Sequence, residues 1–557
     1  MFRKNNFQQM RLDDPLNNMP KYLKEILENS WAHPFQKYIF PNINEERFEV
    51  LYSDNPASRP NSPVNVIIGL LVIKDLFDQT DEELIGSLYF DDRYQYALRT
   101  TSFEKQPVSI NTLTNFRNRA YDYYEETGID LIQQETEAIS KLMAQYLQID
   151  GQKARMDSFM VSSSCKNLSR IELVYKVNSN FIKLLDEISS DSIPKECKAY
   201  LEKGHKNETI YKTRNKDTES KLEFLLKQSK LLYEVGLDMG EKVTDTEEFK
   251  LLQRMLNEQT KDDDNSDQLV PKDNKEISSD SLQNPSDPDA TYRCKYGDNI
   301  GYTVNVLEIF DENNSIITSY DLQPNIYDDS QFAIDVIDKI SVPRSEMSLL
   351  VDGAYYSYEI AKKASSKNIN LIPKDLRGRK PSNEKMSYSN FNIDENKNII
   401  SNCADDKIPV KSFYDEETNT YTAKFDKQDC KGCAYKSECR IQKQKKFNTV
   451  RFTDKEYQTA VLREQMSKKE YQKLVNKRSG IEGAPSTFRR KYNIDDMPIR
   501  GKERAKIWFG FKVIAYNFKK LLKGLEDLDM SDLYSLFFYI FAFLFTQDDN
   551  LALNEQY

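Results

Sequence analysis

The spacing of hydrophobic residues divides the chain into a helical first part and a mixed later part. Over residues 1–145 the apolar positions recur at helical intervals, as in VNVIIGLLVIKDLF, which begins at Val64. Thr80 and Glu83 have the spacing of a capping box before the next apolar run. Ser109 precedes a further helical stretch, INTLTNFRNRAYDYY. The pattern therefore predicts an all-helical amino-terminal domain.

Strand patterns begin with RMDSFMVSSS at residues 155–164, which follows the turn signal Asp150-Gly151. A long stretch with helical periodicity comes next. Strand signals resume as a hairpin, GYTVNVLEIFDENNSIITSYDL, and then helices alternate with the strands MSLLV and INLIP. The order predicts a mixed α/β sheet that is interrupted by a helical insertion.

Two stretches of extreme composition, one polar and one apolar, lie outside this pattern. Residues 261–289 hold 3 basic and 9 acidic residues together with Pro and Ser, which predicts a disordered linker over 261–290. The most apolar run, LYSLFFYIFAFLF at 533–545, is 13 residues long and too short to span a membrane. We expect a packed terminal helix there and no membrane among the partners, and contact of this run with a membrane or a partner is the minor alternative.

Three acids stand out against these elements. Asp157 lies inside the first apolar strand, where a carboxylate is costly to bury unless it binds a cation or a basic partner. Asp352 ends a second apolar strand, and Glu482 stands four residues after Arg478, on one face if this segment is helical. Three carboxylates brought together would form an oxygen-rich site for Mg²⁺ or Mn²⁺. Two such ions suit in-line phosphoryl transfer.

These motifs resemble the DDE triad of bacterial insertion-sequence transposases: Asp157 in M-D-S, Asp352 in LLVDGAYYS and Glu482 in R-x-x-x-E-x-x-x-x-x-x-R. The similar branch has a helical amino-terminal domain and a cysteine-rich insert. The resemblance implies a ribonuclease H-like core and metal-dependent cleavage and transfer of DNA strands. It also implies binding to double-stranded transposon ends and target DNA, as a homodimer in that complex. Asp157, Asp352 and Glu482 would hold Mg²⁺ or Mn²⁺, and Arg478 would hold a phosphate.

The match departs from the family pattern at the third motif. Val475 stands where Tyr is common, and Arg489 stands where Lys is common. Gly483 and Pro485 follow the acid directly, and a proline inside a helix removes a backbone hydrogen bond. We therefore expect a shortened or kinked helix after Glu482.

The resemblance and the patterns together predict the following domain plan. Residues 1–145 form a helical DNA-binding domain, 146–165 the first catalytic strand, 166–260 a helical insertion, 261–290 the linker, 291–376 the rest of the core, 377–450 the cysteine-rich insert, 451–525 the Glu482 helix and a following core helix, and 526–557 an apolar helix and tail.

Candidate DNA-binding residues lie in two places. The helix after Ser109 carries Asn115, Arg117 and Arg119, and a solvated helix face is the alternative interpretation. The stretch 473–523 holds 14 Lys or Arg against 4 acids and includes Arg489, Arg490 and Lys491. It also holds a lysine face that is either solvated or in contact with DNA: Lys506, Lys512, Lys519, Lys520 and Lys523.

The cysteines form one cluster and three isolated thiols. Cys430 and Cys433 form a C-x-x-C pair, and Cys403 and Cys439 could complete a Cys₄ site for a structural Zn²⁺. Reduced thiols in a small β-rich insert are the alternative, and an iron–sulfur cluster is a third possibility. Isolated cysteines are typical of a reducing compartment.

Composition narrows the function further. A length of 557 residues calls for several domains, and only two histidines argue against histidine-based chemistry. The first residues, MFRKNNFQQM, lack the apolar region of a secretory signal, so we expect a cytoplasmic, nucleoid-associated protein. The net charge of −10 excludes a protein that is basic throughout but not local DNA binding. Two other functions stay open: a DNA-binding protein whose catalysis is unused, and a metal-dependent nuclease.

Overall fold

The computed structural model describes residues 1–5, 14–103, 105–212, 217–263, 266–295, 297–378, 384–394 and 396–526. The chain forms two compact units. Unit 1 comprises Met1–Gly151, Ser158–Tyr327 and Ala484–Tyr557, and unit 2 comprises Gln152–Asp157 and Asp328–Gly483. The apolar run at 533–545, for which we predict a helix, lies outside the described residues.

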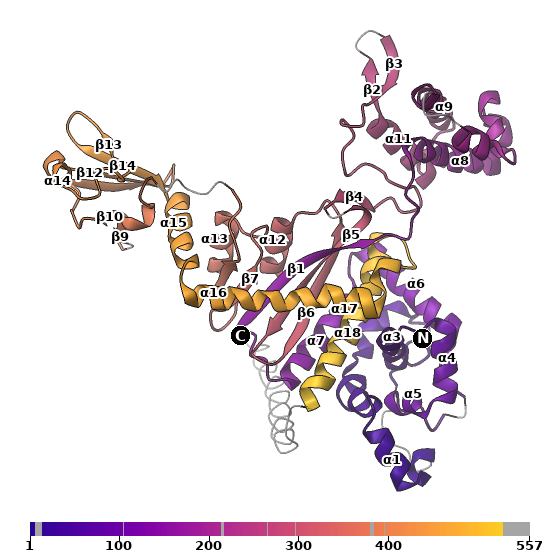
Figure 1. Cartoon of the computed structure of the whole chain (residues 1–557). Helices are drawn as coiled ribbons and strands as arrows, with labels where there is room; N and C mark the ends of the chain where they lie inside the picture. Colours follow the sequence, from indigo (N-terminus) through magenta and orange to yellow (C-terminus); the bar gives the residue numbers. More distant parts are fainter. Residues whose placement is uncertain are drawn as a thin grey trace, which may run out of the picture. The chain divides into compact units, whose positions relative to one another are not determined.

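The amino-terminal part of unit 1 is helical, as the sequence predicts (Figure 1). The two capping boxes are present, with Thr80 before α4 and Ser109 before α6. Nearly every residue of α3 is buried, so this helix lies at the centre of the domain. The elements are η1 (Pro15–Asn18), α1 (Lys21–Glu28), α2 (Ala32–Pro34), η2 (Phe35–Ile39), η3 (Phe40–Asn42), η4 (Glu45–Leu51), α3 (Val64–Phe77), α4 (Asp81–Phe90), α5 (Asp92–Ala97), α6 (Ile110–Thr127) and α7 (Leu131–Tyr146).

A long carboxy-terminal helix, α18 (Lys502–Glu526), completes this domain by packing against α3, α7 and strand β6 (Ser315–Pro324). The buried Asn517 fixes the packing, because its amide donates to Ile317 O at 2.7 Å and accepts from Ile317 N at 3.0 Å. Two hydrogen bonds to one strand residue satisfy a polar group that would otherwise be costly to bury. The helix predicted from the apolar stripe after residue 501 is thus confirmed.

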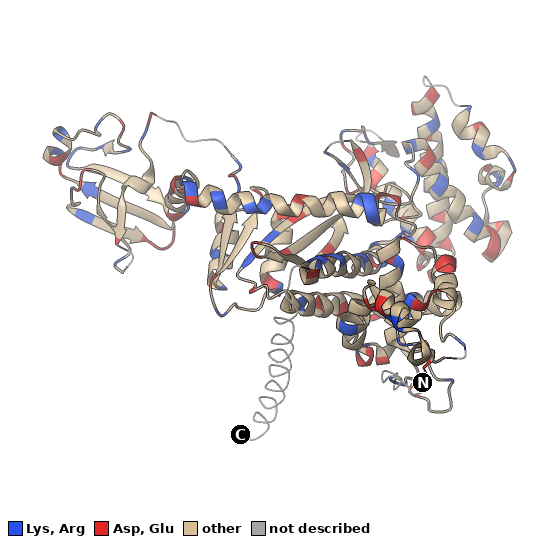
Figure 2. Ribbon diagram, turned by 60° about the horizontal axis from the view of Figure 1, so that its bottom comes forward, with Lys and Arg blue, Asp and Glu red and all other residues tan. Residues whose placement is uncertain are grey.

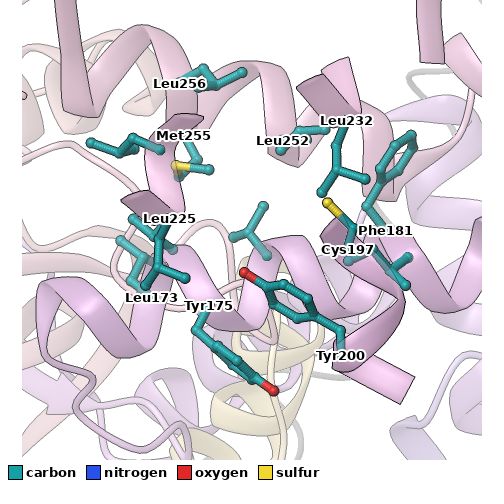
Figure 3. Packing of buried hydrophobic residues seen from close by; sticks show 14 of the residues in the cluster. Leu173, Tyr175, Phe181, Cys197, Tyr200, Leu225, Leu232, Leu252, Met255 and Leu256 are labelled. Carbon is teal, nitrogen blue, oxygen red and sulfur yellow. The ribbon is translucent and has the colours of Figure 1, made fainter. Parts of the chain in front are cut away.

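The helical insertion has a hydrophobic core of its own (Figure 3). Phe181, Leu225, Leu252 and Met255 are fully buried in it, and they come from three different helices. The insertion contains α8 (Arg170–Ser189), η5 (Ser190–Ser192), η6 (Lys195–Leu201), η7 (Asn207–Tyr211), α9 (Thr218–Asp238), α10 (Glu241–Thr244) and α11 (Glu247–Gln259).

The predicted disordered linker over 261–290 is wrong. The structure places a hairpin there, β2 (Thr260–Asp263) with β3 (Ser266–Pro271), followed by ordered turns. Leu282 is buried in the core of the insertion, and Arg254 donates to the carbonyls of Asp280 and Pro288. The acidic composition gave no indication of these apolar and backbone contacts. The contacts offset the entropy cost of ordering the segment.

A mixed sheet has the order β4-β5-β1-β7-β8, with β6 also paired to β5. In unit 1, β5 pairs antiparallel with β4 and β6, and the predicted turn at Asp311 joins the hairpin. In unit 2, β1 and β8 pair parallel with β7, and α13 connects β7 to β8. The elements are β1 (Lys153–Ser162), β4 (Thr291–Cys294), β5 (Asp298–Phe310), β6 (Ser315–Pro324), α12 (Asp329–Lys339), β7 (Met347–Val351), α13 (Tyr358–Ser366) and β8 (Ile369–Pro373).

The cysteine-containing part of unit 2 is a small β structure. Its four-stranded antiparallel sheet, β11-β12-β14-β13, buries Phe425, Val450 and Phe452 on one face. The elements are η9 (Tyr388–Asn390), β9 (Asn392–Asp394), β10 (Ile399–Asn402), β11 (Lys411–Asp415), β12 (Thr420–Phe425), α14 (Lys427–Lys431), β13 (Gln442–Lys443) and β14 (Asn448–Thr453).

Short helices follow this insert: α15 (Asp454–Met466), α16 (Lys469–Asn476), the 3₁₀ helix η10 (Lys477–Glu482), α17 (Gly483–Tyr492) and η11 (Ile494–Asp496). The helix break that Gly483 and Pro485 predict is present, because the 3₁₀ segment ends at Glu482 and α17 starts at Gly483. Pro485 then falls in the first turn of α17, where a missing N–H costs no hydrogen bond. The mixed α/β architecture with a helical amino-terminal region is confirmed.

Candidate active site

The parallel pairing of β1 and β7 positions two of the predicted acids. Its register pairs Lys153 with Ser348, Ala154 with Leu349 and Arg155 with Leu350. Two residues further along, the same register sets Asp157 level with Asp352, which directly follows the last residue of β7. Neighbouring strands lie about 4.8 Å apart, and residues in register point to the same face. Continued by two residues beyond the paired positions, this register would give the two carboxylates adjacent positions on one side of the sheet.

Arg478 links the third predicted acid to the first. Its Nη2 lies 3.0 Å from Asp157 Oδ1, and its Nη1 lies 3.6 Å from Glu482 Oε1. The Arg478 side chain is 5% exposed and that of Glu482 is 56% exposed. Arg478 and Glu482 stand on the 3₁₀ helix η10, not on the predicted α-helix. All four predicted catalytic residues belong to unit 2, and a buried guanidinium lies between two of the carboxylates.

Asp375 is an acid near Asp352 that the sequence motifs missed. A Cβ at Gly353 would lie 1.8 Å from Asp375 Oδ1, so only glycine allows this approach beside Asp352. Asp375 stands two residues after β8, much as Asp352 stands one residue after β7. The signal in the sequence was an acid just past the apolar run INLIP, at the edge where parallel strands end.

The two predicted metal-binding sets stay predictions. Among the described residues, no three His, Cys, Asp or Glu side chains lie close enough together to hold one ion. Among the carboxylates, Arg478 lies 3.0 Å from Asp157 and 3.6 Å from Glu482. The donor chemistry of Asp157 and Asp352, adjacent oxygen ligands, nevertheless suits a hard divalent cation.

The four clustered thiols form no disulfide, and the Zn²⁺ site predicted for them stays a prediction. Cys403, Cys430 and Cys439 pack against the apolar core of the small β structure. Burial raises the pKa of Cys430 and of Cys439, and the neighbouring thiols raise both further. Metal binding would require these thiols to lose their protons. Reduced thiols in a β-rich insert stay the alternative interpretation.

The predicted DNA-binding residues of α6 separate into two groups. Arg117 donates to Asp81 at 3.1 Å, so it joins α6 to the start of α4. Burial opposes the ionisation of Asp81, but hydrogen bonds from Arg117 and Lys74 outweigh it and lower the pKa of Asp81 to about 2. Arg117 is therefore a structural partner of Asp81.

Asn115 and Arg119 instead line a pocket of about 880 Å³ beside the start of α6. Arg119 lies 5.1 Å from the ring centroid of Tyr52. Arg59 and Lys105 add two further cations to the lining, and none of the described residues that line the pocket is Asp or Glu. The pocket is thus suited to an anionic group.

The basic residues of α17 also differ from one another. Arg489 donates to Met160 O at 3.0 Å and lies 3.3 Å from an oxygen of Asp495. Arg490 and Lys491 are exposed at the end of the helix. Figure 2 shows both signs of charge interspersed over the helices of unit 1. Only some of the cations in this basic stretch are therefore accessible to a ligand.

Comparison with protein families yields two matches. Residues 23–119 match the family described as Transposase domain (DUF772), and residues 402–522 match the family described as Transposase DDE domain. Both matches support an insertion-sequence transposase of the DDE type. No curated protein and no solved structure matches it.

The two matches cover different candidate residues of this chain. The first includes Asn115, Arg117 and Arg119, and the second includes Arg478, Glu482 and the basic end of α17. Asp157 and Asp352 lie outside both. Within the described parts of the chain, no helix is long and apolar enough to cross a membrane.

Proposed function

We propose that this transposase cleaves and joins DNA at the ends of an insertion sequence, with Asp157, Asp352 and Glu482 as its catalytic carboxylates. The observation that carries the proposal is the register of β1 and β7, which sets Asp157 beside Asp352, together with the contact of Arg478 with both Asp157 and Glu482. A ribonuclease H-like core is the corresponding fold proposal. The strand order, with β1 central and β7 its neighbour, supports it.

The carboxylates would bind two Mg²⁺ or Mn²⁺ ions, which activate the attacking oxygen and stabilise the leaving one. Asp157 and Asp352 would supply oxygen ligands from neighbouring strands. Glu482, more than half exposed, would approach from η10. Its neighbour Arg478 would turn from Glu482 toward a phosphate oxygen of the DNA, because a guanidinium binds phosphate as readily as carboxylate.

DNA binding would draw on cations that the fold leaves accessible. The pocket at α6 brings Arg59, Lys105 and Arg119 together, and its described lining residues include no carboxylate. Its hydroxyl and amide groups, including Ser109, Thr112 and Asn115, are donors for phosphate oxygens. Arg490 and Lys491 would supply further phosphate contacts. We propose double-stranded terminal repeats as the ligand of these surfaces.

One experiment tests the proposal and separates it from the two alternatives. Wild-type protein and the Asp157→Asn, Asp352→Asn and Glu482→Gln variants are incubated with a labelled end fragment, a target plasmid and Mg²⁺. The proposal predicts nicked ends and strand-transfer products for the wild type, and intact DNA with retained binding for the variants. Nicks without transfer products would favour a nuclease, and binding without nicks would favour a DNA-binding protein.

A further inference from the structure

Arg155 is a buried arginine on β1, two residues before Asp157 and therefore on the same face of the strand. It is 8% exposed. Its Nη1 donates to the carbonyl oxygen of Lys477 at 2.6 Å, and Lys477 is the first residue of η10. A side chain from β1 thus holds the backbone of the 3₁₀ helix that carries Arg478 and Glu482.

Gly480 provides the second contact of Arg155 with η10. A Cβ built on Gly480 would lie 2.2 Å from Nη1, 2.7 Å from Cζ and 2.8 Å from Nη2 of Arg155. All three distances are shorter than any real contact of a Cβ atom, so the guanidinium lies against the glycine backbone. No residue other than glycine leaves room for the arginine at this position.

The two arginines connect β1 and η10 in opposite directions. Arg155 reaches from the strand to the helix backbone, whereas Arg478 reaches from the helix to Asp157 on the strand. Both side chains are nearly fully buried. Together they fix the distance between the strand that carries Asp157 and the turn that carries Glu482.

We propose that Arg155 is a positioning residue of the active site: it holds η10 so that Glu482 reaches the ions that Asp157 binds. This inference rests on the proposed function. Arg155 acts through its contacts with Lys477 and Gly480. Residues that orient metal ligands in this way typically change metal affinity or activity by about 10- to 100-fold when they are replaced.

The chain offers a matched pair of glycines for the test. Gly480→Ala adds one methyl group that displaces the Arg155 guanidinium, the far end of a flexible side chain. Gly483→Ala adds the same methyl group three residues later, where nothing lies within 4 Å of the new Cβ. Neither glycine has a positive φ, so alanine is allowed at both positions. The pair isolates the loss of the Arg155 contact from the effect of replacing a glycine.

Three quantities are measured on each full-length variant: end cleavage in Mg²⁺, Mn²⁺ affinity without DNA by titration calorimetry, and the melting temperature. We expect Gly480→Ala to lower cleavage and Mn²⁺ affinity about 10- to 100-fold, and Gly483→Ala to stay within about twofold of wild type. Arg155→Lys keeps the charge but loses the planar guanidinium, so its cleavage and Mn²⁺ affinity should lie between those of the two glycine variants. The melting temperatures of the two glycine variants should agree.

Two results would overturn the inference in distinguishable ways. If the wild type binds Mn²⁺ and cuts DNA but the two glycine variants behave alike, Arg155 has no positioning role. The same conclusion follows if the cleavage and Mn²⁺ binding lost in Gly480→Ala are no greater than the amount of folded protein that is lost. If the wild type neither binds Mn²⁺ nor cuts DNA, the proposed function is wrong, and the inference that rests on it is overturned with it.

Discussion

Helices α17 and α18 come from the same basic stretch of sequence, yet they use their cations differently. On α18, Lys506 lies 2.8 Å from Asp321, and Lys512 lies 2.7 Å from Asp75. Lys520 pairs with Glu308 in the same way. On α17, Arg490 and Lys491 are exposed. A surplus of positive charge in the sequence therefore overstates the charge that is available to DNA.

The lysines of α18 illustrate why such pairs belong to the fold. Burial alone would lower the pKa of Lys506, but Asp321 outweighs it and raises that pKa. At Asp75 the balance is reversed, because burial raises the pKa more than Lys512 lowers it. Separating either pair would leave a buried charge without its partner. Neither lysine can leave its acid to contact a phosphate without a large cost.

The largest effect should come from Glu482, an acid inside the basic stretch. Glu482→Gln keeps the shape of the side chain but removes the charge that would hold a divalent ion, so end cleavage should fall at least about 1000-fold. Binding to the end fragment should change little, since phosphates contact Lys and Arg. A nicking assay with a parallel mobility-shift assay measures both. Cleavage at the wild-type rate would remove Glu482 from the triad.

The next effect concerns stability. Lys512→Met leaves Asp75 buried without its partner and should lower the free energy of unfolding by about 3–5 kcal/mol at neutral pH. The double variant Asp75→Leu/Lys512→Met should recover most of this loss, because no unpaired charge remains. Chemical denaturation measures both. A stable single variant with weakened DNA binding would mean that α18 contacts DNA and that the contrast between the helices is false.

Replacing Arg490, unlike replacing Lys512, should weaken DNA binding and leave stability unchanged. Arg490→Ala should leave stability within about 0.5 kcal/mol of wild type and reduce the slope of log K against log salt by about 1, as expected for one phosphate contact. Lys227→Ala, which removes an exposed charge on α9, serves as the charge-matched control. The slope comes from fluorescence anisotropy at several salt concentrations. An equal slope for both variants would exclude α17 from the DNA interface.

The smallest effects separate two arginines on α6. Arg119→Ala should weaken end binding by roughly fivefold, about 1 kcal/mol, without changing stability. Arg117→Ala should instead cost about 1 kcal/mol of stability through the lost pair with Asp81 and leave DNA affinity unchanged. Anisotropy and thermal melting of the two variants give the comparison. The reverse assignment would mean that the pocket beside α6 is not a DNA site.

The elements that periodicity predicted are those whose pattern is local. Residues only a few positions apart determine the capping boxes at Thr80 and Ser109 and the hairpin turn at Asp311. The same holds for the alternation of helices and strands around β7. The linker prediction failed because Leu282 is buried by helices far away in the sequence. Composition cannot report such long-range contacts, so it favoured disorder over 261–290.

The candidate site was predicted by residue type but not by geometry. The sequence identified Asp157, Asp352 and Glu482, and the register of β1 and β7 sets the first two side by side. The sequence alone could not show that Arg478 lies between Asp157 and Glu482, nor that Arg155 holds η10. Asp375 escaped notice for the same reason, since only the fold brings it to Gly353.

The central claim is that Asp157, Asp352 and Glu482 bind the same divalent ions, and iron-dependent backbone cleavage tests it most directly. Fe²⁺ replaces Mg²⁺ in the full-length protein on an end fragment, ascorbate and peroxide generate radicals at the bound ion, and mass spectrometry locates the cuts. The account predicts cuts in three segments, around residues 157, 352 and 482, that excess Mg²⁺ suppresses. Cuts that spare any one of the three segments, or that resist Mg²⁺, would contradict it.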